Sequence, residues 1–304
     1  MVRAMSLMTA LIVLVPVGLA AADRQGSYVN DVAKWREKRE AALRADDGWL
    51  TVTGLFWLHQ GASRVGSDPS NDVLLPEGAA PGYIGTLTVT GSKVTFEAEK
   101  PSGVLLNGQP AGLSTLKSDA DGAPDTLSLG HIKLLLLKRD ERYALRLKDN
   151  NSRIRKDFAG LSWYPVDERW RVKARLIPPT QPRNLVYDTI IGGQDELDSA
   201  GYLVFEFEGK EYHLEAAGRG KDLSLVFRDG TSGKTTYGSA RFLSAKVEAD
   251  GTAILDFNKA YNPPCSFTPY ATCPLPPPQN RLSLAITAGE LKYQPKQSSA
   301  ASHD

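Results

Sequence analysis

Polar side chains of the types needed for ligand binding or acid–base chemistry gather in the C-terminal third of this sequence. The segments FRDGTSGKTTYGSARF, DFNKAYN and PPPQNRL supply carboxylate, amide, hydroxyl and guanidinium groups next to expected strand ends. Groups at strand ends and in loops often bind ligands, because the strands hold them on a rigid frame. The candidate ligand-binding residues are Asp229, Thr231, Tyr237, Arg241, Asp256, Asn258, Tyr261, Tyr270, Asn280 and Arg281.

Two of these carboxylates could divide the roles of general acid and general base. Asp229 and Asp256 could do so if their surroundings separate their pKa values, and Arg241 could stabilise developing negative charge. A hydrolase built on this pair is one function that the sequence leaves open. It requires the two carboxyl groups to lie within about 10 Å of each other.

The tripeptide DFN places a carboxylate and an amide on one face of an expected strand. Because side chains alternate, Asp256 and Asn258 would share a face with Ile254. If that face lines the interior of a barrel, both groups need partners, since an unpaired buried charge is very costly. Arg241 or Arg281 could supply one. A structural ion pair and a functional site are both compatible with this pattern.

The segment from Tyr261 to Leu282 is expected to cover these polar groups. It holds both cysteines and seven of the 19 prolines of the chain. Proline fixes φ and removes a backbone donor, and it pushes the preceding residue towards extended geometry. The segment must therefore follow a stiff, irregular path, presenting Phe267, Tyr270 and Asn280. It could form a preordered cover over a ligand, or a cap that only seals one end of the β structure.

The N-terminus has the three-part layout of a secretory signal peptide. Arg3 precedes an apolar run from Leu7 to Leu19, and Ala20 and Ala22 have the spacing of a cleavage signal. Residues 1–22 are therefore predicted to be removed on export. The mature protein is expected to be periplasmic or secreted, with no stable membrane insertion.

Export determines how the two cysteines are interpreted. In an oxidising compartment an isolated pair usually forms a disulfide, so a Cys265–Cys273 bridge is predicted. A zinc site would need further Cys or His ligands at closer spacing, and none of the four histidines is near the pair in sequence. No metal and no cofactor is expected.

Composition and missing motifs exclude several functions. The charges are balanced, with 36 Lys and Arg against 35 Asp and Glu, so no basic footprint for nucleic acid exists. The sequence contains no G-x-S-x-G elbow. It also has no P-loop, no H-E-x-x-H motif and no complete EF-hand loop.

The elements that must position these residues are mainly β. Residues 23–48 are predicted to form a helix, with Gly48 as its stop. Residues 49–150 contain short apolar runs between turns, including the Gly91-Ser92 and Asn107-Gly108 hairpin signals, which predict a β-sandwich. Residues 151–294 predict a second antiparallel β barrel or sandwich, with RLSLAIT as its last strand. The tail 295–304 is polar and expected to be disordered.

Several motifs resemble known families. DGWLTVTGLFWLHQGASRVGSDPSNDVLLP, TTYGSARFL, DFNKAYNPPCSFTPYATCPLPPPQNRL and AGE are similar to a bacterial family catalogued as domain of unknown function 1684, from about Trp35 to Tyr293. That resemblance implies kinship and no particular activity. RVGSDPSNDVLLP, GVLLNG and DTLSLGHIKLLLL, between about Leu55 and Leu147, also resemble a forkhead-associated domain, a phosphothreonine-reading β-sandwich.

One departure from the forkhead-associated pattern removes its ligand site. The arginine that should follow Gly66 is Ser67 here, and a phosphate needs charge-assisted donors such as arginine. The expectation is a sandwich of that shape without a phosphothreonine site. Such a sandwich could instead dock a partner in the cell envelope.

The function favoured by the sequence is binding of a small polar ligand in the C-terminal β domain, under the Cys/Pro-rich segment. The hydrolase and the envelope interaction module remain the alternatives.

Overall fold

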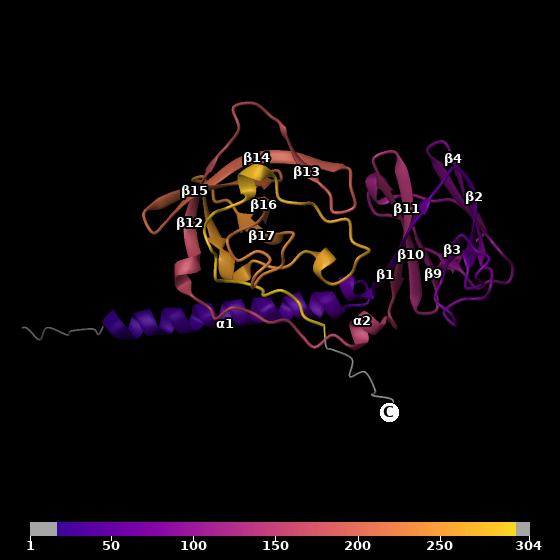
Figure 1. Ribbon diagram of the computed structural model, residues 1–304, viewed down its shortest axis with the longest axis horizontal. Coiled ribbons are helices and arrows are strands. Elements are labelled where there is room, and N and C mark those ends of the chain that lie inside the picture. The colour runs from indigo at the N-terminus through magenta and orange to yellow at the C-terminus, as the bar shows by residue number, and fades with distance from the viewer. Residues whose placement is uncertain (1–16, 296–304) are drawn as a thin grey trace, which may run out of the picture.

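The computed structural model describes residues 17–295 of the chain (Figure 1). Most of the predicted signal peptide and of the predicted tail, residues 1–16 and 296–304, lie outside this described part. Within it, no helix is long and apolar enough to cross a membrane.

A long N-terminal helix, α1 (Val17–Arg44), precedes all the strands. It begins before the predicted start at residue 23 and ends four residues before Gly48. Val32 and Leu43 are buried on its inner face, as their spacing predicts. A side chain at position 48 would lie 2.2 Å from the Leu43 carbonyl oxygen, so only glycine fits there. The helix runs along the lower side of the C-terminal β unit in Figure 1.

Residues 52–149 form two packed sheets, called here the N-terminal sandwich. The first has the order β1-β11-β10-β9-β6-β7 and the second β3-β2-β4-β5-β8. The bounds are β1 (Val52–Leu58), β2 (Gly61–Gly66), β3 (Val73–Leu74), β4 (Gly85–Thr90), β5 (Lys93–Ala98), β6 (Leu105–Leu106), β7 (Gln109–Pro110), β8 (Leu113–Thr115), β9 (Thr126–Leu129), β10 (Ile132–Arg139) and β11 (Arg142–Asp149). Their shared core includes Val65, Phe96, Leu134 and Leu145.

Two turn predictions in this sandwich are confirmed. Gly91 has φ of 58° and opens the β4–β5 hairpin. Asn107 and Gly108 have φ of 50° and 82°, as a type I′ turn requires, and they join β6 to β7.

Residues 171–256 form the C-terminal sheet, in the order β17-β16-β15-β14-β12-β18, with β13 added beside β14. A bridge between Val247 and Ala253 nearly closes it into a barrel. The bounds are β12 (Arg171–Ile177), β13 (Asn184–Asp188), β14 (Gln194–Phe207), β15 (Lys210–Ala217), β16 (Asp222–Phe227), β17 (Arg241–Lys246) and β18 (Thr252–Asp256). The mainly β fold with an N-terminal helix and antiparallel sheets is thus confirmed.

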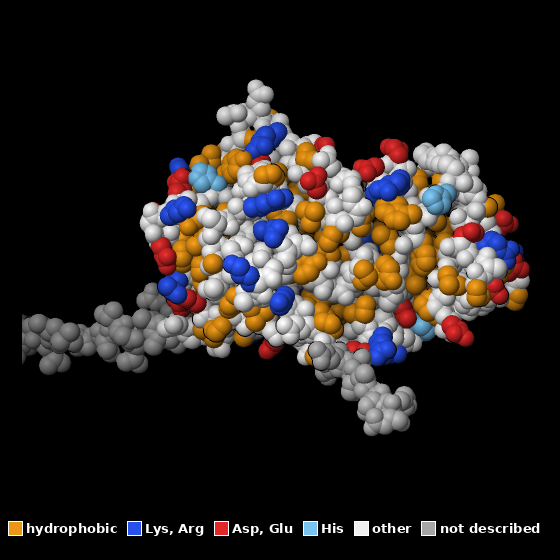
Figure 2. Space-filling view, in the orientation of Figure 1, with side chains coloured by type: hydrophobic (Ala, Val, Ile, Leu, Met, Phe, Trp, Pro, Cys, Tyr) orange, Lys and Arg blue, Asp and Glu red, His pale blue; other side chains and the backbone are white. Residues whose placement is uncertain are grey.

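The interior of the C-terminal sheet is filled by aliphatic and aromatic side chains, including Leu203, Leu225, Phe227 and Phe257. Its outer surface is charged. Figure 2 shows basic side chains spread over one face of this unit, with acidic side chains towards its rim.

Irregular segments connect and complete the two units. The short helix α2 (Arg153–Lys156) and the 3₁₀ helix η3 (Glu168–Trp170) lie in the connection between the units. After β18 come η4 (Phe257–Lys259), η5 (Pro264–Ser266) and η6 (Pro278–Asn280). The prediction of a strand at RLSLAIT is wrong, because only Arg281 forms a bridge there, with Arg228.

Candidate functional site

The ten predicted binding residues are distributed over several parts of the C-terminal unit. Most of them fall into separate groups, each formed around the segment that follows β18. Asp229 and Asp256, the predicted acid–base pair, belong to different groups: Asp229 pairs with Arg241, and Asp256 contacts Tyr28 and Lys259.

The first group is a buried ion pair between β16 and β17. Arg241 Nη1 lies 2.6 Å from Asp229 Oδ2, and both side chains are fully buried. The other carboxylate oxygen accepts hydrogen bonds from the backbone and hydroxyl of Thr231, both at 2.6 Å. Arg241 also donates to the carbonyl oxygens of Ile286, at 3.1 Å, and Ala288. The pair therefore fastens the C-terminal segment to the sheet.

The second group lies under α1. The Tyr28 hydroxyl donates to Asp256 Oδ1 at 2.7 Å, and Lys259 Nζ lies 3.2 Å from Oδ2. Asn258 donates to the Tyr28 oxygen at 2.9 Å and to the Asp167 carbonyl at 2.8 Å. Burial and the hydrogen bond to Asp256 raise the pKa of Tyr28. These contacts hold the helix against the end of β18 and η4.

Asp256 lies on the outer face of β18, so the interior placement that the sequence left open does not apply. Ala253 and Leu255 point into the core, whereas Ile254 is 38% exposed on the outer face. Because β18 ends at Asp256 and η4 follows, Asn258 does not continue the strand alternation. The helix α1 covers the outer face of β18 at the end of the strand, where Tyr28 contacts Asp256. The pattern of residues along the strand does not indicate this contact.

The third group surrounds a buried glutamate. Glu290 is fully buried, and its Oε2 lies 3.6 Å from Arg39 Nε and 3.3 Å from the Asn262 backbone nitrogen. Arg39 also donates to the Asn262 carbonyl at 2.8 Å and lies over the Tyr261 ring at 4.7 Å. Burial raises the pKa of Glu290 to about 7. This group anchors the C-terminal part of α1 and places Tyr261 against it.

The fourth group closes a gap in the C-terminal sheet. β15 and β16 share a single residue pair in register. Asn280 fills the gap, accepting a hydrogen bond from the Glu215 N–H at 2.7 Å and donating to the Glu215 and Val226 carbonyls at 2.8 and 3.0 Å. The Glu215 carboxylate accepts hydrogen bonds from Ser199 and Gln279, both at 2.6 Å. Asn280 thus replaces missing strand pairing.

Replacing Asn280 with alanine is expected to lower the free energy of unfolding by about 2 kcal/mol, because it leaves buried backbone groups of β15 and β16 without partners. Urea denaturation measures this change. Arg281→Ala is the matched control, since the exposed Arg281 side chain makes only a long contact of 3.4 Å to the Pro276 carbonyl. Equal losses in the two variants would contradict a bridging role for Asn280.

The two cysteines are not joined as predicted. Cys265 and Cys273 are free thiols, and the Cys265 backbone N–H donates to Cys273 Sγ at 3.2 Å. A hydrogen bond between the thiols lowers the pKa of Cys265 and raises that of Cys273. The Tyr237 hydroxyl donates to the Cys265 carbonyl at 3.1 Å, and burial raises the pKa of Tyr237 to about 12. The disulfide prediction is corrected to a contacting dithiol.

The middle of the Cys/Pro-rich segment contacts the N-terminal sandwich. Thr268 donates to the Val52 carbonyl of β1 at 2.9 Å, and Arg139 of β10 reaches Thr272 at 3.5 Å. Tyr270 is 36% exposed. The segment therefore joins the sandwich to the C-terminal sheet, and α1 covers the aspartate instead.

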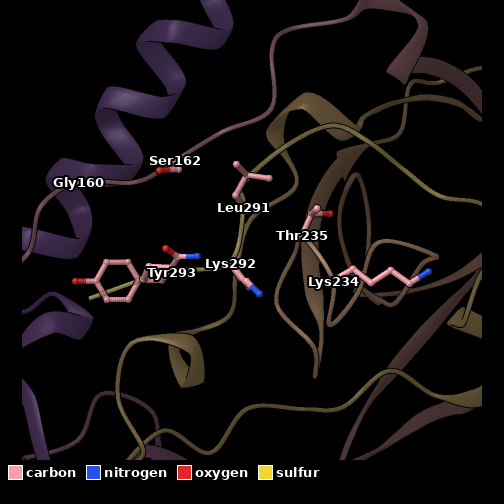
Figure 3. Close-up of a pocket in the computed structure, with 8 residues that line it drawn as sticks. Gly160, Ser162, Lys234, Thr235, Leu291, Lys292 and Tyr293 are labelled. Carbon is pink, nitrogen blue, oxygen red and sulfur yellow. The ribbon is translucent and has the colours of Figure 1, made fainter. Parts of the chain in front are cut away.

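An open pocket of about 390 Å³ lies where three segments of the C-terminal unit meet (Figure 3). Its lining residues are Gly160, Ser162, Lys234, Thr235, Leu291, Lys292, Tyr293 and Gln294. They come from the connection before β12, the turn between β16 and β17, and the segment after Glu290. No carboxylate belongs to this lining, so its two lysines make it positive.

Hydrogen bonds hold the three walls together. The Leu291 N–H donates to the Ser162 carbonyl at 2.8 Å, and the Lys292 N–H donates to the Thr235 carbonyl at 3.0 Å. The hydroxyls of Tyr164 and Thr235 lie 2.5 Å apart. In Figure 3, Ser162 and Leu291 lie on one side of Thr235, and the Lys234 side chain extends away from them on the other side.

Some predicted residues support this pocket without lining it. Asp229 fixes Thr231, whose carbonyl accepts hydrogen bonds from the N–H groups of Lys234 at 3.0 Å and Thr235 at 3.1 Å. The Tyr293 ring packs 5.1 Å from the ring of Phe267, so the Cys/Pro-rich segment backs one wall. The buried network therefore positions the turn that carries Lys234 and Thr235.

None of the lining residues is among the ten candidates predicted from the sequence. Lys234 and Thr235 lie inside FRDGTSGKTTYGSARF, the segment with the densest polar groups, so a signal for them existed. Ser162 and Lys292 lie far apart in sequence and have no motif. Only the pairing of their segments in three dimensions brings them together.

Comparisons with known proteins give kinship without an activity. The family model described as "Protein of unknown function (DUF1684)" matches residues 156–291. Among solved structures, the chain is similar to the uncharacterized protein from gene locus rrnAC0354 of Haloarcula marismortui, at 33% identity over 45% of this chain and 78% of that one, with a TM-score of 0.38. No curated protein matches the chain.

Proposed function

Because the chain belongs to the DUF1684 family of proteins of unknown function, we propose its function from its own geometry: it binds a small organic anion in the pocket between Ser162, Thr235 and Lys292. The observation that carries this proposal is a lining with two lysines, hydroxyl groups and no carboxylate. An anionic ligand would supply the missing negative charge.

The size and polarity of the pocket support a small polar ligand. A volume of about 390 Å³ lies in the range of small-molecule sites, which is about 300–1,000 Å³. Ser162, Thr235 and Gln294 add groups that can donate hydrogen bonds to carboxylate or phosphate oxygens. Glu40, the nearest carboxylate to Gly160, already accepts a hydrogen bond from the Leu161 N–H at 2.9 Å.

The rigidity of the walls also supports binding. The turn that presents Lys234 and Thr235 is held from below by Thr231 and the buried pair of Asp229 and Arg241. A turn that is ordered before binding loses little conformational entropy when the ligand enters. The signal-peptide pattern of residues 1–22 extends the proposal to a ligand met in the periplasm or outside the cell.

Removing both pocket lysines is expected to weaken ligand binding by about 25-fold, because each partly exposed charge contact is worth about 1 kcal/mol. A thermal-shift screen of organic carboxylates and phosphates first identifies a ligand. Isothermal titration of that ligand into the double variant Lys234→Gln/Lys292→Gln then measures the loss of affinity. Affinity should also fall as salt rises.

The control for this test is Lys221→Gln, which removes an exposed lysine of the same unit that does not line the pocket. Its affinity should equal that of the unchanged protein. A hit whose affinity is the same in the double variant and in the control would contradict anion binding at this pocket, as would a screen in which no anion binds.

A further inference from the structure

The two thiols form a second cluster, at the junction of the two β units. Cys265 lies in η5 and Cys273 eight positions later, and both are held by backbone contacts. The Cys265 N–H donates to Cys273 Sγ at 3.2 Å, and the Cys273 carbonyl accepts from the Ile190 N–H at 3.0 Å. The flanking prolines stiffen both positions. Cys265 therefore lies against the Cys273 sulfur on a rigid frame, and no disulfide joins them.

The cluster offers two sulfur atoms and no further strong ligand. Cys273 is 5% exposed and Cys265 is half-buried, so solvent reaches the pair from the Cys265 side. Within residues 17–295, no group of three or more Cys, His, Asp or Glu side chains could hold a metal. A tetrahedral zinc site, which needs four ligands, is not available here.

A buried arginine, Arg146, interacts electrostatically with the Cys273 thiol. Arg146 of β11 is only 8% exposed, and its Nε and one terminal nitrogen have no hydrogen-bond partner in the described part of the chain. It stacks over the Trp49 ring at 5.0 Å, and its electrostatic neighbours are Arg139, Asp119 and Cys273, of which the first two carry opposite charges. A buried charge without a partner is very costly, and unsatisfied groups of this kind often face an ion that occupies the site in use.

We propose that Cys265 and Cys273 together bind one copper(I) ion, with Arg146 as the counter-charge. Thiolates are soft ligands and select copper(I). Two thiolates and one monovalent ion carry a net charge of −1, which the guanidinium neutralises. As each sulfur–metal bond forms, its thiol releases one proton. Two protons leave and no electron is transferred.

Anaerobic titration of the reduced full chain with copper(I), in competition with a chromophoric copper(I) chelator, tests the proposal. One equivalent should bind, and X-ray absorption should detect two sulfur ligands. Cys265→Ser and Cys273→Ser should each lose binding by at least 100-fold. Arg146→Gln should weaken it by about 10-fold, whereas Arg142→Gln, an exposed arginine of the same strand, should not change it.

Two measurements decide the outcome if a variant fails to fold. In the unchanged protein, copper(I) should protect both thiols from alkylation, as mass spectrometry detects. Protein isolated without reductant and unfolded in a thiol reagent should show two free thiols. No free thiol, meaning a permanent disulfide, would overturn the proposal. Unchanged copper affinity in either serine variant, or alkylation unaffected by copper(I), would do the same.

Discussion

Replacing Arg241 with methionine is expected to lower the free energy of unfolding by about 3–5 kcal/mol, the cost of removing one partner from a buried ion pair. Arg241 and Asp229 are fully buried and 2.6 Å apart, so the variant leaves a carboxylate without its counter-charge. Methionine fills much of the same volume, which keeps the loss from being one of packing. Equilibrium denaturation in urea at neutral pH measures the change.

The same substitution should increase the local opening of the chain segment that follows η6, from Ile286 to Lys292. Arg241 donates to the carbonyls of Ile286 and Ala288, and Gly289 packs so closely that a Cβ there would lie 2.8 Å from Arg241 Nη2. This glycine has φ of 82°, so other residues would be strained. Hydrogen exchange should therefore rise at Leu291 and Lys292, which form one wall of the pocket.

Two controls separate the buried charge from other effects. Arg219→Met breaks the exposed pair with Asp198 and should cost far less, because solvent already screens that pair. In the double variant Asp229→Asn/Arg241→Met, part of the lost stability should return, since no charge stays unpaired. If Arg241→Met costs no more than Arg219→Met, the pair does not hold the segment.

Local signals in the sequence predicted the strands and turns well. The Asn107-Gly108 pair requires positive φ at both residues, and that requirement acts within four residues of chain. The alternation across Gly91 likewise fixed the β4–β5 register. Such features depend only on backbone sterics and side-chain direction within a few residues. They can therefore be predicted from a single sequence.

The pairing of polar groups could not be predicted, because it depends on contacts far apart in the chain. Arg241 was a candidate partner for Asp256, yet it pairs with Asp229, and Asp256 binds Tyr28, 228 positions away. Both carboxylates needed partners, as burial requires. Which donor each receives was decided by where α1 and the last segment pack, and no local pattern encodes that.

The pocket illustrates the same limit for function. The residues singled out for their chemistry, such as Asp229 and Asn280, are buried and satisfied, so they stabilise the fold. The lining lysines are exposed and unremarkable in sequence. The dense cluster of polar residue types therefore marked mainly the frame of the candidate site, together with the turn that carries Lys234 and Thr235.

Replacing Glu290 with glutamine is expected to stabilise the protein at pH 8 and to have little effect near pH 4. Burial raises the pKa of Glu290 from 4.5 to about 7 in the folded protein. Between these values the folded state holds a proton that the unfolded state has released, so stability falls as pH rises from about 4.5 to about 7. Glutamine removes this loss, which amounts to about 3 kcal/mol.

The contacts around Glu290 decide whether the glutamine variant is more stable or less stable at pH 8. Oε1 of Glu290 has no partner in the described part of the chain, and Arg39 Nε is 3.6 Å from Oε2, longer than a charge-assisted hydrogen bond. A neutral amide keeps the acceptor for the Asn262 N–H. Urea denaturation of both proteins between pH 4 and 8 should give curves that separate above about pH 5.

Glu215→Gln provides the opposite case within the same unit. Glu215 is equally buried, yet its carboxylate accepts hydrogen bonds from Ser199 and Gln279 and pairs with Arg183. Its replacement should therefore destabilise the protein at pH 8. If Glu290→Gln also destabilises at pH 8, the Glu290 carboxylate is ionised and Arg39 is its true partner. Two buried glutamates with opposite responses would establish that hydrogen-bond supply, and not burial alone, decides whether the charge is tolerated.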